Sequence, residues 1–133
     1  NEIGPFPQIT HYEEILEQRI KIEMLARTQI EKLNESFEQA AYQWQEIQKN
    51  LQKKPSWKRW LFGYSQSEID AIQKQKKIFI NIRQESEALM QQSYDQISRP
   101  RAIDLYTSAS KNIESAEKIL DEINHQDFVW WNH

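Results

Sequence analysis

The sequence contains no cysteine, only two glycines and four prolines, and no long apolar run. Without cysteine the chain has no disulfide, no thiolate for a metal and no thiol nucleophile. A sheet of several strands normally requires more turn residues than this chain provides. The longest apolar run covers the four residues 128–131, whereas a helix needs about 20 apolar residues to span a bilayer. These absences favour a helical protein without a membrane span.

The residues that are present are mostly helix formers. Glutamine supplies 16 of the 133 residues, and Glu, Lys, Ile, Leu and Ala fill most of the other positions. With 38% hydrophobic and 28% charged residues, the chain is too apolar to be disordered and too polar to bury both faces of every helix. We predict a single all-α domain over residues 1–133, an elongated antiparallel three- or four-helix bundle. Because the chain begins with Asn rather than Met, we expect a module of a larger protein.

A coiled-coil-like seam predicts a long first helix over residues 9–53. Neither glycine nor proline occurs between Pro7 and Pro55, and seven apolar residues in this stretch recur at alternating steps of three and four. They are Ile30, Leu33, Phe37, Ala40, Trp44, Ile47 and Leu51. The segment Asn-Glu-Ser at 34–36 is a candidate break in this helix.

Two shorter helices are predicted to follow. Ser67–Asp70 offers a capping box, which predicts a second helix over residues 67–98. This helix is expected to end before Pro100, because proline disfavours helical geometry in the preceding residue. A third helix is predicted over residues 100–125. Antiparallel packing then leaves residues 9–23 beyond the ends of the other helices, so they must fold back, contact another chain or pack on a missing part of the protein.

The connection between the first two helices, residues 53–64 (the tip), has an unusual composition. Its sequence is KKPSWKRWLFGY, whereas a routine helix connection is short and polar. Ser56 and Gly63 are placed to cap a single helical turn. The residues presented by that turn would be Trp57, Trp60, Leu61 and Phe62, with Lys58 and Arg59 among them.

Charge is segregated along the chain in the same way. Residues 49–77 contain eight basic and two acidic residues, a balance of +6, and the rest of the chain carries −9. The formal net charge of −3 therefore hides a basic pole that coincides with the tip. Because the third helix returns to this end, the aromatic tail at 128–131 is expected there as well.

Two interpretations of this pole remain open. The aromatic residues could form a satellite core that closes the bundle, in which case Trp57 and Trp60 would be buried against the tail. Alternatively the tip enters an anionic membrane interface, where tryptophan prefers headgroup depth and each basic residue contributes about 1 kcal/mol. A headgroup pocket would also require convergent cations. The candidates are Lys49, Lys53, Lys58, Arg59, Lys74 and Lys77.

The Gln- and Lys-rich helices and the Trp- and Lys-bearing tip resemble the phosphatidylinositol 4-phosphate-binding domains of bacterial secreted effectors that decorate host vacuoles. In those domains helices form a headgroup pocket, and an apolar loop inserts beside it. The resemblance implies peripheral association with a membrane in the cytoplasm of a host cell. It implies that the inserting residues are Trp57, Trp60, Leu61 and Phe62. The pocket residues that it implies are Lys54, Lys58, Arg59 and Lys77.

Patterns typical of enzymes and cofactor sites are weak. Glu122 and His125 have the spacing of a di-iron ligand pair, but the other histidines are only His11 and His133, and such a site needs a second pair. Two glycines cannot build a phosphate-binding loop or a dinucleotide fingerprint. We predict no catalytic residue, no metal site and no cofactor. Nucleic acid is disfavoured as a partner, because the pI of about 5.7 and the acidic bulk oppose a polyanion.

The sequence therefore predicts a non-enzymatic membrane-targeting module. It would bind anionic lipid through the tip, with a phosphoinositide such as phosphatidylinositol 4-phosphate as the more specific candidate. The alternative is a helical protein-interaction or scaffold domain, which would hold a partner protein through the heptad helix or the aromatic pole.

Overall fold

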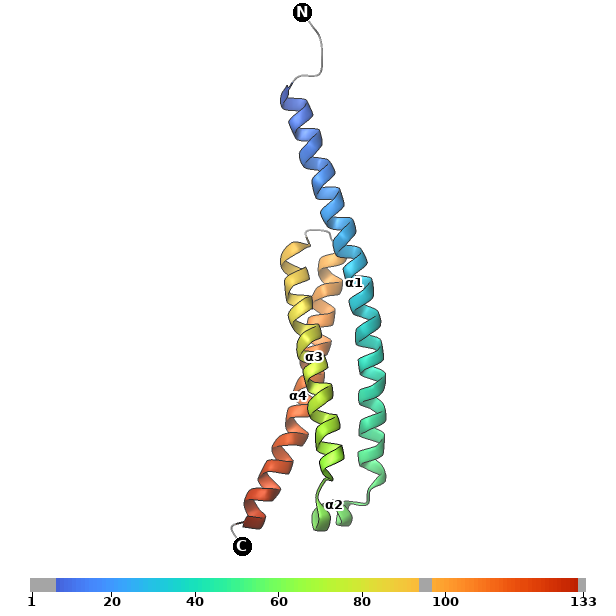
Figure 1. Ribbon diagram of the computed structural model, residues 1–133, viewed down its shortest axis with the longest axis vertical. Coiled ribbons are helices and arrows are strands. Elements are labelled where there is room, and N and C mark those ends of the chain that lie inside the picture. The colour runs from blue at the N-terminus through green and yellow to red at the C-terminus, as the bar shows by residue number, and fades with distance from the viewer. Residues whose placement is uncertain (1–6, 94–96, 132–133) are drawn as a thin grey trace, which may run out of the picture.

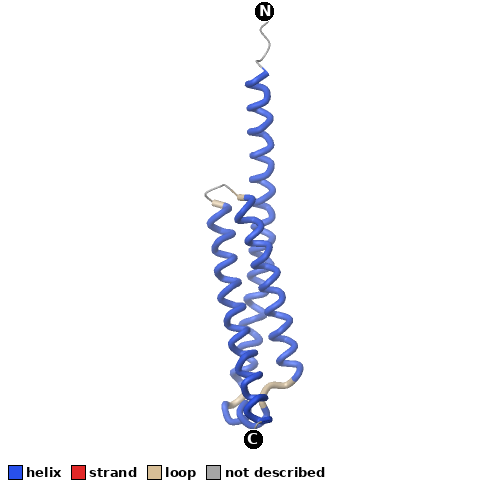
Figure 2. The backbone as a smooth tube through the Cα atoms, turned by 90° about the vertical axis from the view of Figure 1, so that its left-hand side faces the viewer, coloured by secondary structure: helices blue, strands red, loops and turns tan. Residues whose placement is uncertain are grey.

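The computed structural model is an all-α bundle, as predicted (Figure 1). It describes the backbone of residues 7–93 and 97–131, and the side chains of those residues except 7–9, 60, 62 and 126–131. The helices in this described part are α1 (Pro7–Lys53), α2 (Ser56–Phe62), α3 (Gln66–Gln92) and α4 (Ser98–Trp131). The three long helices run antiparallel to their neighbours along the chain, and α2 lies at the end where α1 passes to α3 (Figures 1 and 2).

The core is a narrow seam shared by the three long helices. It is built from buried apolar side chains at the predicted heptad positions of α1, from Ile72, Phe79, Ile82 and Leu89 of α3, and from one face of α4. The rings of Phe37 and Phe79 join α1 to α3, with centroids 6.0 Å apart. On α4 a fully buried alanine recurs every seven residues, at 102, 109 and 116. These small side chains let α4 pack closely on α3.

Glutamine also links the helices, which hydrophobic periodicity does not reveal. The buried Gln75 Nε2 of α3 donates a hydrogen bond of 2.7 Å to the carbonyl oxygen of Ala40 in α1. Gln48 Nε2 of α1 lies 3.5 Å from the Ser115 hydroxyl oxygen of α4. Buried polar groups are costly unless paired, so these bonds favour one rotational setting of α1 against the other helices.

Several predicted helix boundaries are wrong. The candidate break at 34–36 does not form, because α1 continues through it and Asn34 Nδ2 donates to Glu38 Oε1 one turn later at 3.3 Å. α3 ends at Gln92 rather than near residue 98. Pro100 lies in the first turn of α4, where a backbone N–H has no partner within the helix. Proline therefore helps to begin α4 instead of ending α3, and α4 continues to Trp131 instead of stopping near 125.

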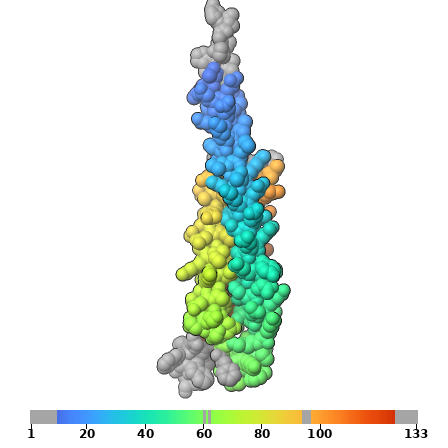
Figure 3. Space-filling model, turned by 45° about the vertical axis from the view of Figure 1, so that its right-hand side comes forward, coloured from blue at the N-terminus to red at the C-terminus, as the bar shows by residue number. Residues whose placement is uncertain are grey.

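The N-terminal part of α1 extends past the ends of α3 and α4 (Figures 1 and 2). Ala26 is the first buried side chain of α1, and residues 10–25 are exposed except for the half-buried Glu23. We call residues 7–25 the overhang. On the face shown in Figure 3, no other helix covers residues 10–25 of the overhang. The sequence-based expectation that residues 9–23 outrun the bundle is confirmed.

Candidate functional site

The helical turn of the tip is α2, a seven-residue helix. Pro55 precedes it with φ −57° and ψ 148° and accepts hydrogen bonds from the amides of Lys58 and Arg59 at 3.0 and 3.2 Å. Ser56 is therefore the first residue of α2 and not its cap. Gly63 ends the helix, as predicted, and its amide donates to the Arg59 carbonyl at 2.9 Å. Its φ of 64° and ψ of −147° define a conformation that is essentially restricted to glycine.

Lys54 connects the two ends of the tip to each other and to the start of α3. Its Nζ donates to the carbonyl oxygen of Gly63 at 3.3 Å and to Glu68 Oε1 at 2.8 Å. Gly63 lies directly after α2, and Glu68 lies in the first turn of α3. The ion-paired side chains are only 29% and 24% exposed, so solvent screens this pair less than an open surface pair. Lys54, a predicted headgroup ligand, is therefore engaged within the protein.

The capping box at the start of α3 uses Ser65, two residues before the predicted Ser67. The Glu68 amide donates to Ser65 Oγ at 3.1 Å, and the Ser65 amide donates to Glu68 Oε1 at 2.9 Å. Ser65 and Glu68 match the Ser-x-x-Glu pattern more fully than Ser67 and Asp70 do. Burial raises the pKa of Glu68, but hydrogen bonds from Lys54 and Ser65 outweigh it, so the pKa lies below its usual value of 4.5. Glu68 therefore holds the cap and Lys54 together as a carboxylate.

Two large apolar side chains of α2 face solvent. Trp57 is 58% exposed and Leu61 is 53% exposed, and their spacing of four places them on the same face of the helix. Lys58 Nζ lies 5.6 Å from the centroid of the Trp57 ring, within the range of a cation–π contact. Trp57, Leu61 and Lys58 thus form one mixed aromatic and basic surface.

The remaining aromatic residues of this pole lie partly outside the described residues. Trp60 and Phe62 belong to α2, but their side chains are not among those described. The same holds for the tail at 128–131, although the C-terminal end of α4 reaches the end of the molecule that carries α2 (Figure 1). Contact between Trp57 and the tail is therefore left open, whereas the exposure of Trp57 itself favours a free surface.

The basic residues of the pole fall into two groups. In the first group each lysine forms an ion pair: Lys49 with Glu46 at 3.5 Å, Lys76 with Glu117 at 3.4 Å, and Lys54 with Glu68 at 2.8 Å. The second group, which forms no ion pair within the described part of the chain, contains Lys53, Lys58, Arg59, Lys74 and Lys77.

Arg59 is the half-buried member of this second group. Its Nη2 lies 3.5 Å from Ser56 Oγ, and its buried Nε has no hydrogen-bond partner among the described atoms. The lysines of this group do not all point toward one site. Lys77 follows the buried Ile72 by five residues, so it lies on the side of α3 that faces away from the core. The tip therefore has a cationic surface rather than a ring of lysines.

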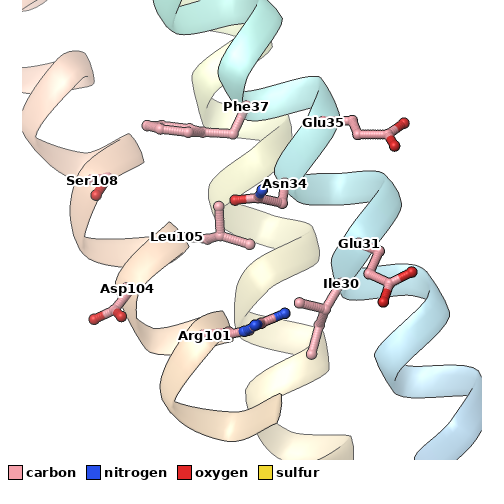
Figure 4. Close-up of a pocket in the computed structure, with 9 residues that line it drawn as sticks. All are labelled: Ile30, Glu31, Asn34, Glu35, Phe37, Arg101, Asp104, Leu105 and Ser108. Atoms are coloured by element: carbon pink, nitrogen blue, oxygen red, sulfur yellow. The ribbon is translucent and has the colours of Figure 1, made fainter. Parts of the chain in front are cut away.

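Two hollows of the bundle lie away from the tip. One of about 450 Å³ lies between α1 and α4, where Arg101 extends from α4 toward Ile30 (Figure 4). Its other lining residues are Glu31, Asn34, Glu35, Phe37, Asp104, Leu105 and Ser108. A second, of about 420 Å³, lies between α1 and α3 and is lined by both lysine and glutamate. Neither is lined by a basic residue of the tip, and both mix charges of opposite sign.

Within the described residues, no group of three or more His, Asp or Glu side chains is arranged to hold a metal. No helix among them is long and apolar enough to cross a membrane. Comparison of the chain with protein-family models, curated proteins and solved structures gives no match. The function is therefore inferred from the geometry of the tip.

Proposed function

We propose that this domain is a non-enzymatic module that binds the surface of an anionic membrane through the tip. The observation that supports this most is the exposure of Trp57 and Leu61 on one face of α2, beside Lys58 and Arg59. An exposed apolar patch bordered by polar groups is typical of an interaction surface. A surface that alternates tryptophan with cations suits the headgroup region, where the indole ring is partly buried and its N–H stays hydrated.

The energies of the two contributions are compatible with reversible binding. Five basic residues near an anionic leaflet contribute at most about 5 kcal/mol, which corresponds to an affinity of roughly 0.2 mM. Insertion of the exposed parts of Trp57 and Leu61 adds about 2–4 kcal/mol at 25 cal/mol per Å². The sum reaches roughly micromolar affinity, and neither contribution suffices alone.

The contacts of Lys54 support the same proposal. They hold α2 in place before any ligand arrives, so insertion requires little further ordering of the chain. The hydrogen bonds to Gly63 and Glu68 thus give Lys54 a positioning role, and the headgroup contacts fall to Lys53, Lys58, Arg59, Lys74 and Lys77.

A phosphoinositide is the narrower candidate for the lipid. Its headgroup carries several negative charges, and five basic residues of this pole form no ion pair within the described chain. Phosphatidylinositol 4-phosphate is also the lipid implied by the resemblance to effector domains, which would place the protein on a host membrane. The spread of the lysines favours recognition of charge density, so vesicles with phosphatidylserine at equal total charge should bind measurably.

Co-sedimentation with vesicles tests this proposal. Neutral phosphatidylcholine vesicles are compared with vesicles that also contain phosphatidylserine or phosphatidylinositol 4-phosphate at equal total charge. Trp57→Ala with Leu61→Ala should weaken binding more than about tenfold. The matched control is Tyr42→Ala, which removes a ring that is 66% exposed on α1 and should not change binding.

Charge reversal gives the second arm of the experiment. Lys58→Glu with Arg59→Glu should weaken binding strongly at low salt and less at high salt, because ions screen the attraction. Lys32→Glu with Lys111→Glu makes the same change in net charge away from the tip and should have a much smaller effect. If the unaltered protein ignores both kinds of anionic vesicle, the proposal is wrong.

A further inference from the structure

The overhang exposes several large apolar side chains. These are Tyr12 (62% exposed), Ile15 (42%), Leu16 (40%), Ile20 (56%), Ile22 (51%), Met24 (62%) and Leu25 (59%). The overhang is 19 residues long, which corresponds to about 28 Å of helix. A helix of this length is marginal in water without a packed face, and three of the seven side chains are β-branched isoleucines with lower helix propensity.

Three of these side chains form a stripe that repeats the core-facing side of α1. Eighteen residues make about five turns of an α-helix, so residues eighteen apart lie on the same face. Tyr12, Ile15 and Ile22 therefore lie on the same face of α1 as three buried core residues. These core residues are Ile30, Leu33 and Ala40, which are 2%, 4% and 2% exposed. The overhang thus continues the surface that packs on α3 and α4, and it does so beyond the point where those helices end.

Charges along the overhang indicate what covers the stripe. Glu13 and Glu14 precede its middle, Glu17 lies next to the middle, and Arg19 and Lys21 follow together with the half-buried Glu23. Two parallel copies in register would bring like charges together. Two antiparallel copies bring Glu13 and Glu14 of one chain beside Arg19 and Lys21 of the other, which lowers the electrostatic energy.

From this stripe and this charge pattern we infer that the overhang pairs antiparallel with the overhang of a second copy of the chain. At roughly half exposure, the side chains of the stripe and those that border it offer on the order of a few hundred Å² of apolar area per chain. This is the scale of a reversible dimer rather than an obligate one. The dimer forms by helix pairing and does not require the tip.

The geometry of the dimer also bears on the tip. With the contact centred near residue 16, each α1 runs about 55 Å from the contact to Lys53, so the two tips lie about 110 Å apart and face opposite ways. This consequence rests on the proposed function: with both tips bound to lipid, such a dimer joins two anionic membrane surfaces. The tests below are made in solution without lipid, so their outcome is independent of membrane binding.

Sedimentation velocity over a range of protein concentrations tests the dimer. The unaltered chain should shift from monomer to dimer as its concentration rises. Ile15→Glu should raise the dissociation constant more than about tenfold. Tyr42→Glu, a matched change at an exposed position of α1 outside the overhang, should leave it unchanged. Both variants should keep the helical circular dichroism of the bundle, which separates loss of pairing from loss of folding.

Single-cysteine labelling tests the orientation, because the chain has no cysteine of its own. Gln18→Cys chains carrying donor and acceptor dyes should show energy transfer on mixing, since residue 18 lies near the contact. Asn50→Cys chains should show none, because the antiparallel arrangement separates the two dyes by about 100 Å. Transfer at both positions would mean a parallel dimer and would overturn the inference.

Charge exchange separates charge-dependent pairing from nonspecific hydrophobic association. Glu14→Lys with Glu17→Lys should weaken self-association, and so should Arg19→Glu with Lys21→Glu. A mixture of these two double variants should form a mixed dimer, because each half again meets an opposite charge. If the unaltered chain stays monomeric at every concentration, or if the mixture pairs no better than either variant alone, the inference is wrong.

Discussion

The two ends of the molecule both expose large apolar side chains, but they do so on differently supported helices. At the tip, Trp57 and Leu61 project from a helix of seven residues that Gly63 ends and Lys54 fastens. At the overhang, α3 and α4 end before the exposed stripe begins (Figure 1). The tip is a short, fixed surface without helical repeat, which suits a flat partner such as a membrane. The overhang repeats a packing face, which suits another helix.

The largest difference between these regions should appear in the stability of the bundle. Trp44→Ala removes a core side chain that is 3% exposed and should lower the free energy of unfolding by about 3–5 kcal/mol. Deletion of residues 1–25 should lower it by less than about 0.5 kcal/mol, since the overhang does not contribute to the core. Urea denaturation at a concentration where the protein is monomeric gives both values. A loss of several kcal/mol on deletion would show that the overhang belongs to the bundle.

Sequence patterns predicted the helices and the core of α1 well. The seven heptad residues are buried or half-buried, because a helix that packs on one side must repeat its apolar residues with the period of the helix. The ends of the helices were less predictable. Ser65 and Ser67 are both acceptable caps by sequence, and Glu68 selects Ser65 because it also pairs with Lys54, fourteen residues earlier. Pro100 is compatible with the end of one helix before it and with the first turn of a helix that contains it, and local sequence does not distinguish the two.

The site was predictable only in part, for the same reason. The sequence places Trp57, Lys58 and Arg59 on one turn, but their exposure depends on how α2 sits against the bundle. The convergence of Lys74 and Lys77 with the tip depends on the rotation of α3, which Gln75 and other core residues determine. The sequence also did not reveal the partner of Lys54, because an ion pair between a loop residue and a helix fourteen residues later leaves no local pattern.

The contacts of Lys54 should hold the tip in place. Lys54→Ala removes the hydrogen bonds to Gly63 and Glu68 and should destabilise the protein by about 1–3 kcal/mol. Lys53→Ala is the matched control, because the neighbouring Lys53 is exposed and forms no ion pair within the described residues. It should change stability by less than about 0.5 kcal/mol. If both substitutions changed stability equally, the contacts of Lys54 would not hold the tip in place, and the tip would be no better supported than the overhang.

The smallest expected effect is a dependence of the tip on pH. The pKa of Glu68 is lowered in the folded protein, so its contribution is fully present above the unfolded value of about 4.5 and is lost as the pH falls through the folded pKa. The unaltered chain should therefore exceed Glu68→Gln in stability at neutral pH and approach it in acid. Urea midpoints measured for both chains give this difference, since the other carboxylates titrate alike in both. A difference that stays constant to about pH 3 would mean that the carboxylate charge does not hold the tip.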